Sequence, residues 1–173
     1  MMKYKYLILL LFLCILSFTK GHAQNLKLEN LIKLNQLNLE EFQEYMYGNQ
    51  FSFLHAKTNS RTDTISFINK KDVVAGFIVS KKTNTVFVDN IKEKYFEELN
   101  SDLKSPDFVL VETKVKAENT LEKIYLNTTT ESIIQVSVIS NIEQSNQVEN
   151  IYKLTVITPT KYVYRKYLSK VKK

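Results

Sequence analysis

The chain has 173 residues, a net charge of +6 and a single cysteine, which lies within a predicted leader of 23 residues. Without that leader the chain has the length of one ordinary domain and contains no cysteine, which excludes disulfides and thiolate chemistry. The leader also carries three lysines and no acidic residue, so the net charge falls to +3, too little to indicate a nucleic-acid-binding protein.

The leader has the three parts of a secretory signal peptide. Lys3 and Lys5 form the charged region, residues 7–18 form an apolar run, and small residues precede a cleavage site between Ala23 and Gln24. The apolar run is shorter than the roughly 20 residues that a membrane span needs. We therefore predict a signal peptide over residues 1–23 and export of the remaining chain, which would be periplasmic or secreted and without a transmembrane anchor.

Two helices are predicted next, over residues 26–37 and 39–47, because apolar residues recur there at helical spacing. Asn38 followed by Glu41 matches a capping box, in which each side chain accepts a hydrogen bond from the backbone N–H of the other residue. Gly48 then follows the second helix, as is typical of a helix end.

Beyond Gly48 the apolar residues alternate or form short runs rich in β-branched and aromatic side chains, which indicates strands. A later helix ends at Ser105, because the residue before a proline disfavours the helical conformation. The last segment, residues 161–168, fits neither period, and we favour a strand slightly over a helix. The predicted strands are residues 51–57, 62–69, 74–81, 85–89, 108–114, 121–127, 132–140 and 151–158, with the helix at residues 91–103.

The two predicted halves, residues 24–90 and 91–168, align at an offset of 57 residues, which pairs Phe51 with Phe108. Each half is a helix followed by an antiparallel meander. We therefore expect an α+β fold, in which the N-terminal helices and the middle helix pack on antiparallel β-sheet. Duplication is one explanation of the repeat. The chance likeness of amphipathic helices and strands is the other.

In its leader, in the helix at residues 39–48 and in the strand at residues 51–57, the chain resembles small exported proteins of Gram-negative bacteria with AT-rich genomes, a class with no assigned activity. In gross layout it resembles the tandem helix-plus-antiparallel-sheet arrangement of β-lactamase inhibitor proteins. Its paired N-terminal helices are similar to those of small outer-membrane assembly lipoproteins. None of these resemblances includes a residue-level motif, so none of them implies a mechanism.

The candidate binding residues are tyrosines beside basic residues near the C-terminus, since tyrosine buries a large area and still offers a hydroxyl. Catalytic and metal chemistry have little support. His55 is the only histidine after the leader, which excludes two-histidine zinc motifs, and strict alternation places its side chain with Phe51 and Phe53. No cofactor or metal is predicted. The candidate binding residues are Tyr152, Tyr162, Tyr164, Arg165 and Tyr167.

Three functions remain open at this stage. The favoured one is an exported, non-enzymatic protein of the cell envelope whose sheet or C-terminal surface binds another protein or an envelope component. A carrier of a small apolar ligand is the alternative, with a sheet-lined cavity formed by Phe51, Phe53, Phe67 and Phe77. An envelope hydrolase that uses His55 or a helix carboxylate in a cleft is third.

Overall fold

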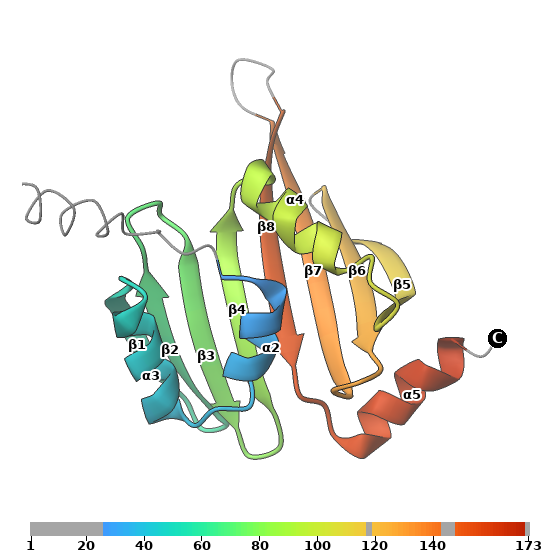
Figure 1. Ribbon diagram of the computed structural model, residues 1–173, viewed down its shortest axis with the longest axis horizontal. Helices are drawn as coiled ribbons and strands as arrows, with labels where there is room; N and C mark the ends of the chain where they lie inside the picture. The colour runs from blue at the N-terminus through green and yellow to red at the C-terminus, as the bar shows by residue number, and fades with distance from the viewer. Residues whose placement is uncertain (1–25, 117–118, 143–147, 172–173) are drawn as a thin grey trace, which may run out of the picture.

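The structure is a computed structural model, which describes residues 26–116, 119–142 and 148–171. The predicted signal peptide lies outside these residues. The described chain forms one eight-stranded antiparallel sheet with four helices, and the predicted α+β class is confirmed (Figure 1). The strands are β1 (Ser52–Thr58), β2 (Thr62–Ile68), β3 (Val74–Ser80), β4 (Asn84–Ile91), β5 (Phe108–Lys116), β6 (Thr120–Asn127), β7 (Ser132–Ile142) and β8 (Val148–Ile157).

The helices are α2 (Leu28–Leu34), α3 (Leu39–Gly48), α4 (Glu93–Asp102) and α5 (Lys161–Val171). The predicted capping box of α3 is confirmed. The side chain of Asn38 accepts a hydrogen bond from the Glu41 N–H at 3.0 Å, and the Glu41 carboxylate accepts one from the Asn38 N–H at 3.0 Å. These two bonds satisfy N–H groups that have no partner within the helix, so the helix begins where the sequence predicts.

The strand favoured at residues 161–168 is wrong, because this segment forms helix α5. Tyr164, Tyr167 and Leu168 have the i, i+3, i+4 spacing of one helical face, and that face packs on apolar residues of the sheet. Tyr162 lies on the exposed side of the helix. When Tyr162, Tyr164 and Tyr167 are all counted as apolar, the sequence pattern fits neither a helix nor a strand. Tertiary packing therefore selects the helix.

The sheet has two different faces. Helices α2, α3 and α4 lie across one of them (Figure 1), which we call the helix face, and they cover the main core. Phe42 of α3 is fully buried there, stacked on Phe77 with ring centroids 5.0 Å apart and in edge contact with Phe67 at 6.0 Å. We call the opposite face the strand face. Helix α5 covers its part over β5, β6 and β7, where Tyr164 packs with Ile124, Leu126 and Ile133 and Lys170 bonds Glu112.

The strand order is β1-β2-β3-β4-β8-β7-β6-β5, so each half contributes four consecutive strands and the halves meet at β4 and β8. Both edge strands contain a bulge at equivalent places. In β1 the register shifts between Phe53 and His55, and in β5 it shifts between Leu110 and Glu112, which lie 57 residues later. The two halves thus agree in strand order and in the position of this local irregularity.

A single row of paired residues crosses all eight strands of the strand face. The junction between the halves is the pair Phe87 and Thr155, which occupy equivalent positions. Val86 of β4 is equivalent to Leu154 of β8, and Val88 to Val156. Val86 pairs with Val156 and Val88 with Leu154, so a local two-fold axis passes through the central pair. The row runs His55, Ser66, Gly76, Phe87, Thr155, Gln135, Ile124 and Glu112.

Candidate functional site

The part of the strand face that α5 leaves open is the candidate binding surface. It extends from β1 across β2, β3 and β4 to β8 and β7, and its side chains alternate along each strand with those of the main core. Most of these side chains are half-buried, as on a sheet face that meets solvent. The surface comprises His55, Lys57, Thr64, Ser66, Ile78, Thr85, Phe87, Asp89, Gln135, Lys153 and Thr155.

An aromatic ring lies at the centre of this surface, on the local two-fold axis. The Phe87 side chain extends over Gly76 of the neighbouring strand, and a Cβ added to Gly76 would lie 2.2 Å from Phe87 Cζ. A glycine inside a strand costs conformational entropy, and close approach of another group is one reason to find it there. Gly76 therefore provides the space that lets the Phe87 ring lie flat on the sheet.

A charged pair holds the ring on its other side. Lys153 Nζ of β8 lies 5.1 Å from the centroid of the Phe87 ring and 3.0 Å from Asp89 Oδ2 of β4. Such a cation–π contact at a half-exposed site is worth about 0.5–1 kcal/mol. The ring therefore lies between a glycine and an ion pair, so its orientation is restricted before any partner arrives.

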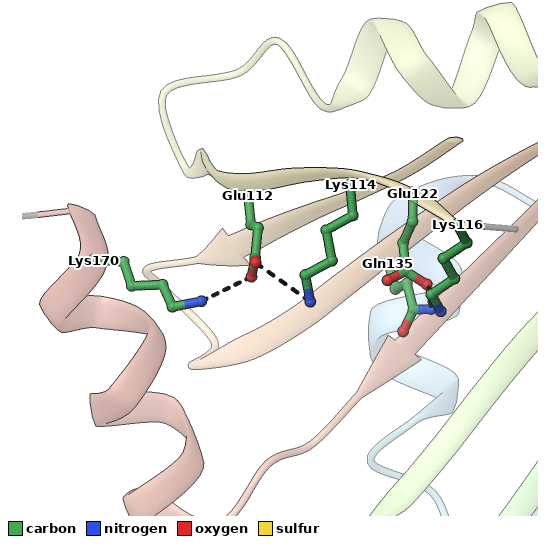
Figure 2. Close-up of polar contacts among 6 residues, drawn as sticks. All are labelled: Glu112, Lys114, Lys116, Glu122, Gln135 and Lys170. Atoms are coloured by element: carbon green, nitrogen blue, oxygen red, sulfur yellow. Dashed lines mark hydrogen bonds and ion pairs between the residues drawn. The ribbon is translucent and has the colours of Figure 1, made fainter. Parts of the chain in front are cut away.

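A second polar group lies on the same face at the β5 end, near α5 (Figure 2). Glu122 is 3% exposed, and its carboxylate accepts hydrogen bonds from Lys116 and Gln135. Each carboxylate of the group is neutralised by lysine, so the group joins strands β5, β6 and β7 and has no carboxylate set apart for acid–base chemistry.

Glu112 belongs to this group and links it to α5. Its carboxylate accepts a hydrogen bond from Lys170 Nζ at 2.8 Å and lies 3.4 Å from Lys114 Nζ, as Figure 2 shows. The hydrogen bond from Lys170 lowers the pKa of the Glu112 carboxyl, and the same bond raises the pKa of the Lys170 ammonium. Lys170 thus fastens the C-terminal turn of α5 to β5.

The five candidate residues from the sequence do not form one surface. Tyr152 lies on β8 and faces the helices, where its ring stacks on Phe96 with centroids 4.0 Å apart and planes 10° apart. It is a core residue. The other four lie on α5, where Tyr164 is buried, Tyr167 is half-buried and only Tyr162 and Arg165 are exposed.

His55 does not share a face with Phe53. Phe53 pairs with Phe67 on the helix face, whereas His55 pairs with Ser66 on the strand face, because the bulge at Leu54 inserts one extra residue between them. The strict alternation used in the sequence analysis is therefore wrong at this point. His55 is exposed on the edge strand.

The aromatic residues assigned to a ligand cavity mostly fill the core. Phe51, Phe67 and Phe77 are each at most 3% exposed, and the rings of Phe67 and Phe77 both contact Phe42. Phe53 lies at the edge of the sheet and is 51% exposed. Phe51, Phe67 and Phe77 are therefore core residues that pack against protein.

A separate groove of about 960 Å³ lies between α2 and the segment that joins α4 to β5. Leu28 and Ile32 of α2 and Phe108 of β5 supply its apolar part. Its rim carries three lysines and three carboxylates from residues 27–36 and 101–107, so its charges balance. The groove thus has no net charge.

Sequence reasoning missed Phe87, Gly76 and Lys153 as members of a surface. Gly76 was the available signal, since a glycine within an otherwise β-branched strand often marks the close approach of another group. The identity of the approaching group depends on the register between β3 and β4, which pairs Gly76 with Phe87.

Comparison of the chain with protein-family models, with curated proteins and with solved structures finds no match. Within residues 26–116, 119–142 and 148–171, no helix has the length and apolar character needed to cross a membrane. The same residues contain no cluster of three or more histidine, cysteine or acidic side chains placed to hold a metal ion.

Burial raises the pKa of several tyrosine hydroxyls, most strongly that of Tyr95. Its hydroxyl donates a hydrogen bond of 2.6 Å to the Leu26 carbonyl in the core. Burial likewise raises the pKa values of Tyr45, Tyr125, Tyr152 and Tyr164.

Because an unfolded tyrosine ionises near pH 10, the unfolded state loses these protons first, and we expect the free energy of unfolding to fall as the pH rises above about 10. Titration of the tyrosinate absorbance should show the ionisation of Tyr95 only together with unfolding. The variant Tyr95→Phe removes this contribution, so its stability should decline less steeply in the same pH range. An equally steep decline would contradict the assignment of Tyr95.

Proposed function

We propose that the protein is an exported, non-catalytic binding protein of the cell envelope, and that it engages another protein through the open strand face. The observation that carries the proposal is the half-buried ring of Phe87, held at the centre of the sheet between Gly76 and the Lys153–Asp89 ion pair. Aromatic side chains at the centre of a patch, surrounded by polar residues, are typical of the residues that dominate binding energy in protein interfaces.

The size of the strand face suits this role. Eight strands about 4.8 Å apart span about 34 Å, and strands of seven residues are about 23 Å long, so the face covers on the order of 800 Å². One partner contributes about 800 Å² to an interface of standard size. Part of this area lies under α5, so a partner would cover the remainder, which extends to the edge strand β1.

The surroundings of Phe87 support binding of a folded protein. Thr85 on the same strand and Thr155 on the neighbouring strand place hydroxyl groups beside Phe87, and hydroxyls both donate and accept hydrogen bonds. Because Gly76 and the Lys153–Asp89 pair already restrict the Phe87 ring, little rotamer freedom is lost at this side chain when a partner binds. A rigid, mixed polar and aromatic surface of this kind favours recognition by shape complementarity.

The test is capture of envelope proteins by the immobilised protein, comparing the wild type with Phe87→Ala. We expect at least one partner to be retained specifically and its affinity to fall about 30-fold in the variant, the effect of a central aromatic residue. Leu110→Ala is the matched control, because Leu110 is 50% exposed and faces the other side of the sheet. This control should bind like the wild type.

Two results would overturn the assignment of the surface. If Phe87→Ala retains every partner with unchanged affinity while its fold is intact, the strand face is not the binding surface. If Tyr162→Ala on α5 removes the partner instead, the C-terminal helix is the surface. Circular dichroism of each variant distinguishes loss of binding from loss of folding.

A further inference from the structure

Helix α5 presents a face of uniform positive charge. The helix carries four basic residues and no acidic one. Tyr162 is 79% exposed, and Arg165, Lys166 and Ser169 lie three, four and seven residues further on, so all four occupy the same side of the helix. We call this side the basic face of α5. Lys161 and Lys170 lie at its two borders.

The opposite side of α5 attaches the helix to the sheet. Tyr164 is 8% exposed and packs with Leu168 against the strand face, and Lys170 is bonded to Glu112. The basic face must therefore point away from the body of the protein. Among the described residues the ion pairs include none formed by Lys161, Arg165 or Lys166, which leaves three cations without a fixed counter-charge.

Acidic groups near α5 are few. Glu112 is occupied by Lys170 and Lys114, and Glu131 faces Tyr164 on the attached side. The charge on the basic face is therefore not cancelled by the neighbouring strands. A complementary surface for it has to be anionic, and it has to accept the exposed Tyr162 ring among the cations.

We propose that α5 docks the protein on an anionic lipid bilayer, with its basic face against phosphate headgroups and the Tyr162 ring at the interface. Long flexible lysine side chains without fixed partners suit mobile headgroups arranged in a plane. Tyrosine has an apolar ring and a polar tip, which favours the boundary between headgroup and acyl chain. The proposal rests on the predicted export of the chain and is independent of partner binding by the strand face.

The expected affinity is modest and sensitive to salt. Each basic residue close to an anionic surface raises partitioning about fivefold, so three cations contribute about 100-fold at low ionic strength. Lys161, Arg165 and Lys166 supply this contribution. Screening at about 0.5 M salt should remove most of it, because the Debye length then falls to about 4 Å.

The test is sedimentation of the exported form of the protein with vesicles. Vesicles of equal parts phosphatidylglycerol and phosphatidylcholine are compared with vesicles of phosphatidylcholine alone. The variant Lys161→Ala/Arg165→Ala/Lys166→Ala should bind the anionic vesicles about 100-fold less well than the wild type. The control Lys70→Ala/Lys71→Ala/Lys82→Ala removes the same charge from exposed lysines near the turns around β3, and it should bind like the wild type.

Three outcomes would overturn the proposal. The first is equal binding to the neutral and the anionic vesicles. In the second, the control variant loses as much binding as the α5 variant, which would indicate attraction through net charge alone. The third is absence of vesicle binding together with retention of an acidic protein that depends on Lys161, Arg165 and Lys166. Because none of these substitutions alters the strand face, failure here leaves the Phe87 test unaffected.

Discussion

Replacing Phe42 with alanine is expected to lower the free energy of unfolding by about 3–5 kcal/mol. The Phe42 ring is fully buried between α3 and the sheet, where it stacks on Phe77 and contacts the edge of Phe67. Its removal loses the transfer free energy of the ring and leaves a cavity that two large neighbouring rings cannot fill. Since a domain of this size is stable by about 5–15 kcal/mol, the variant should retain only part of its stability.

Urea denaturation followed by circular dichroism measures this effect as a shift of the midpoint at constant slope. Leu39→Ala is the control, because Leu39 lies on the same helix and is 38% exposed. We expect the control to lose less than about 1 kcal/mol. Equal losses in the two variants would show that α3 contributes through its helical propensity and not through the contacts of Phe42.

Replacing Gly76 with alanine is expected to cost about 1–3 kcal/mol and to displace Phe87. The new Cβ would lie 2.2 Å from Phe87 Cζ and 2.9 Å from the carbonyl oxygen of Ile65. The ring can rotate away, whereas the carbonyl belongs to the backbone of β2 and moves only with the strand. The first contact therefore disturbs the candidate binding surface, and the second lowers the stability of the sheet.

Gly48→Ala is the matched control, because no atom lies within 4 Å of a Cβ at this position and α3 already extends to it. We expect its stability to be unchanged or up to about 1 kcal/mol higher, since alanine favours the helix. The double variant Gly76→Ala/Phe87→Ala separates the two contacts. Urea denaturation measures the free energy of unfolding of each variant. If the double variant loses less than the sum of the two single losses, the cost of Gly76→Ala comes from contact with the Phe87 ring. An unchanged cost assigns it to the backbone of β2.

Local patterns predicted most of the elements in this chain. The capping box of Asn38 and Glu41 uses two residues three positions apart, so the bonds that begin α3 can be inferred before the fold is known. The alternation in β4 likewise reflects burial on one side, where Val86 and Val88 are buried and Phe87 between them is not. Such features depend on near neighbours in the chain, and the α+β layout follows from their order.

The two errors in secondary structure and orientation have a common cause. The type of residues 161–171 depends on Ile124, Leu126 and Ile133, about 30–40 residues earlier, which receive Tyr164. The side on which His55 projects depends on a bulge, which is defined only by pairing with β2. In both cases the outcome depends on contacts with a segment distant in the chain. The periodicity of apolar residues within one segment does not report those contacts.

The sequence by itself determined the leader pattern, the absence of cysteine beyond it, the order of helices and strands before α5, and the alignment of two halves at an offset of 57 residues. Only the tertiary structure decided which side chains form surfaces. Pairing of β4 with β8 joins the halves about the Phe87–Thr155 pair, and packing of α5 separates Tyr162 from the buried Tyr164. The reason is physical: most element types follow from neighbours along the chain, whereas exposure, and the type of the weakly patterned α5 segment, follow from which distant elements pack together.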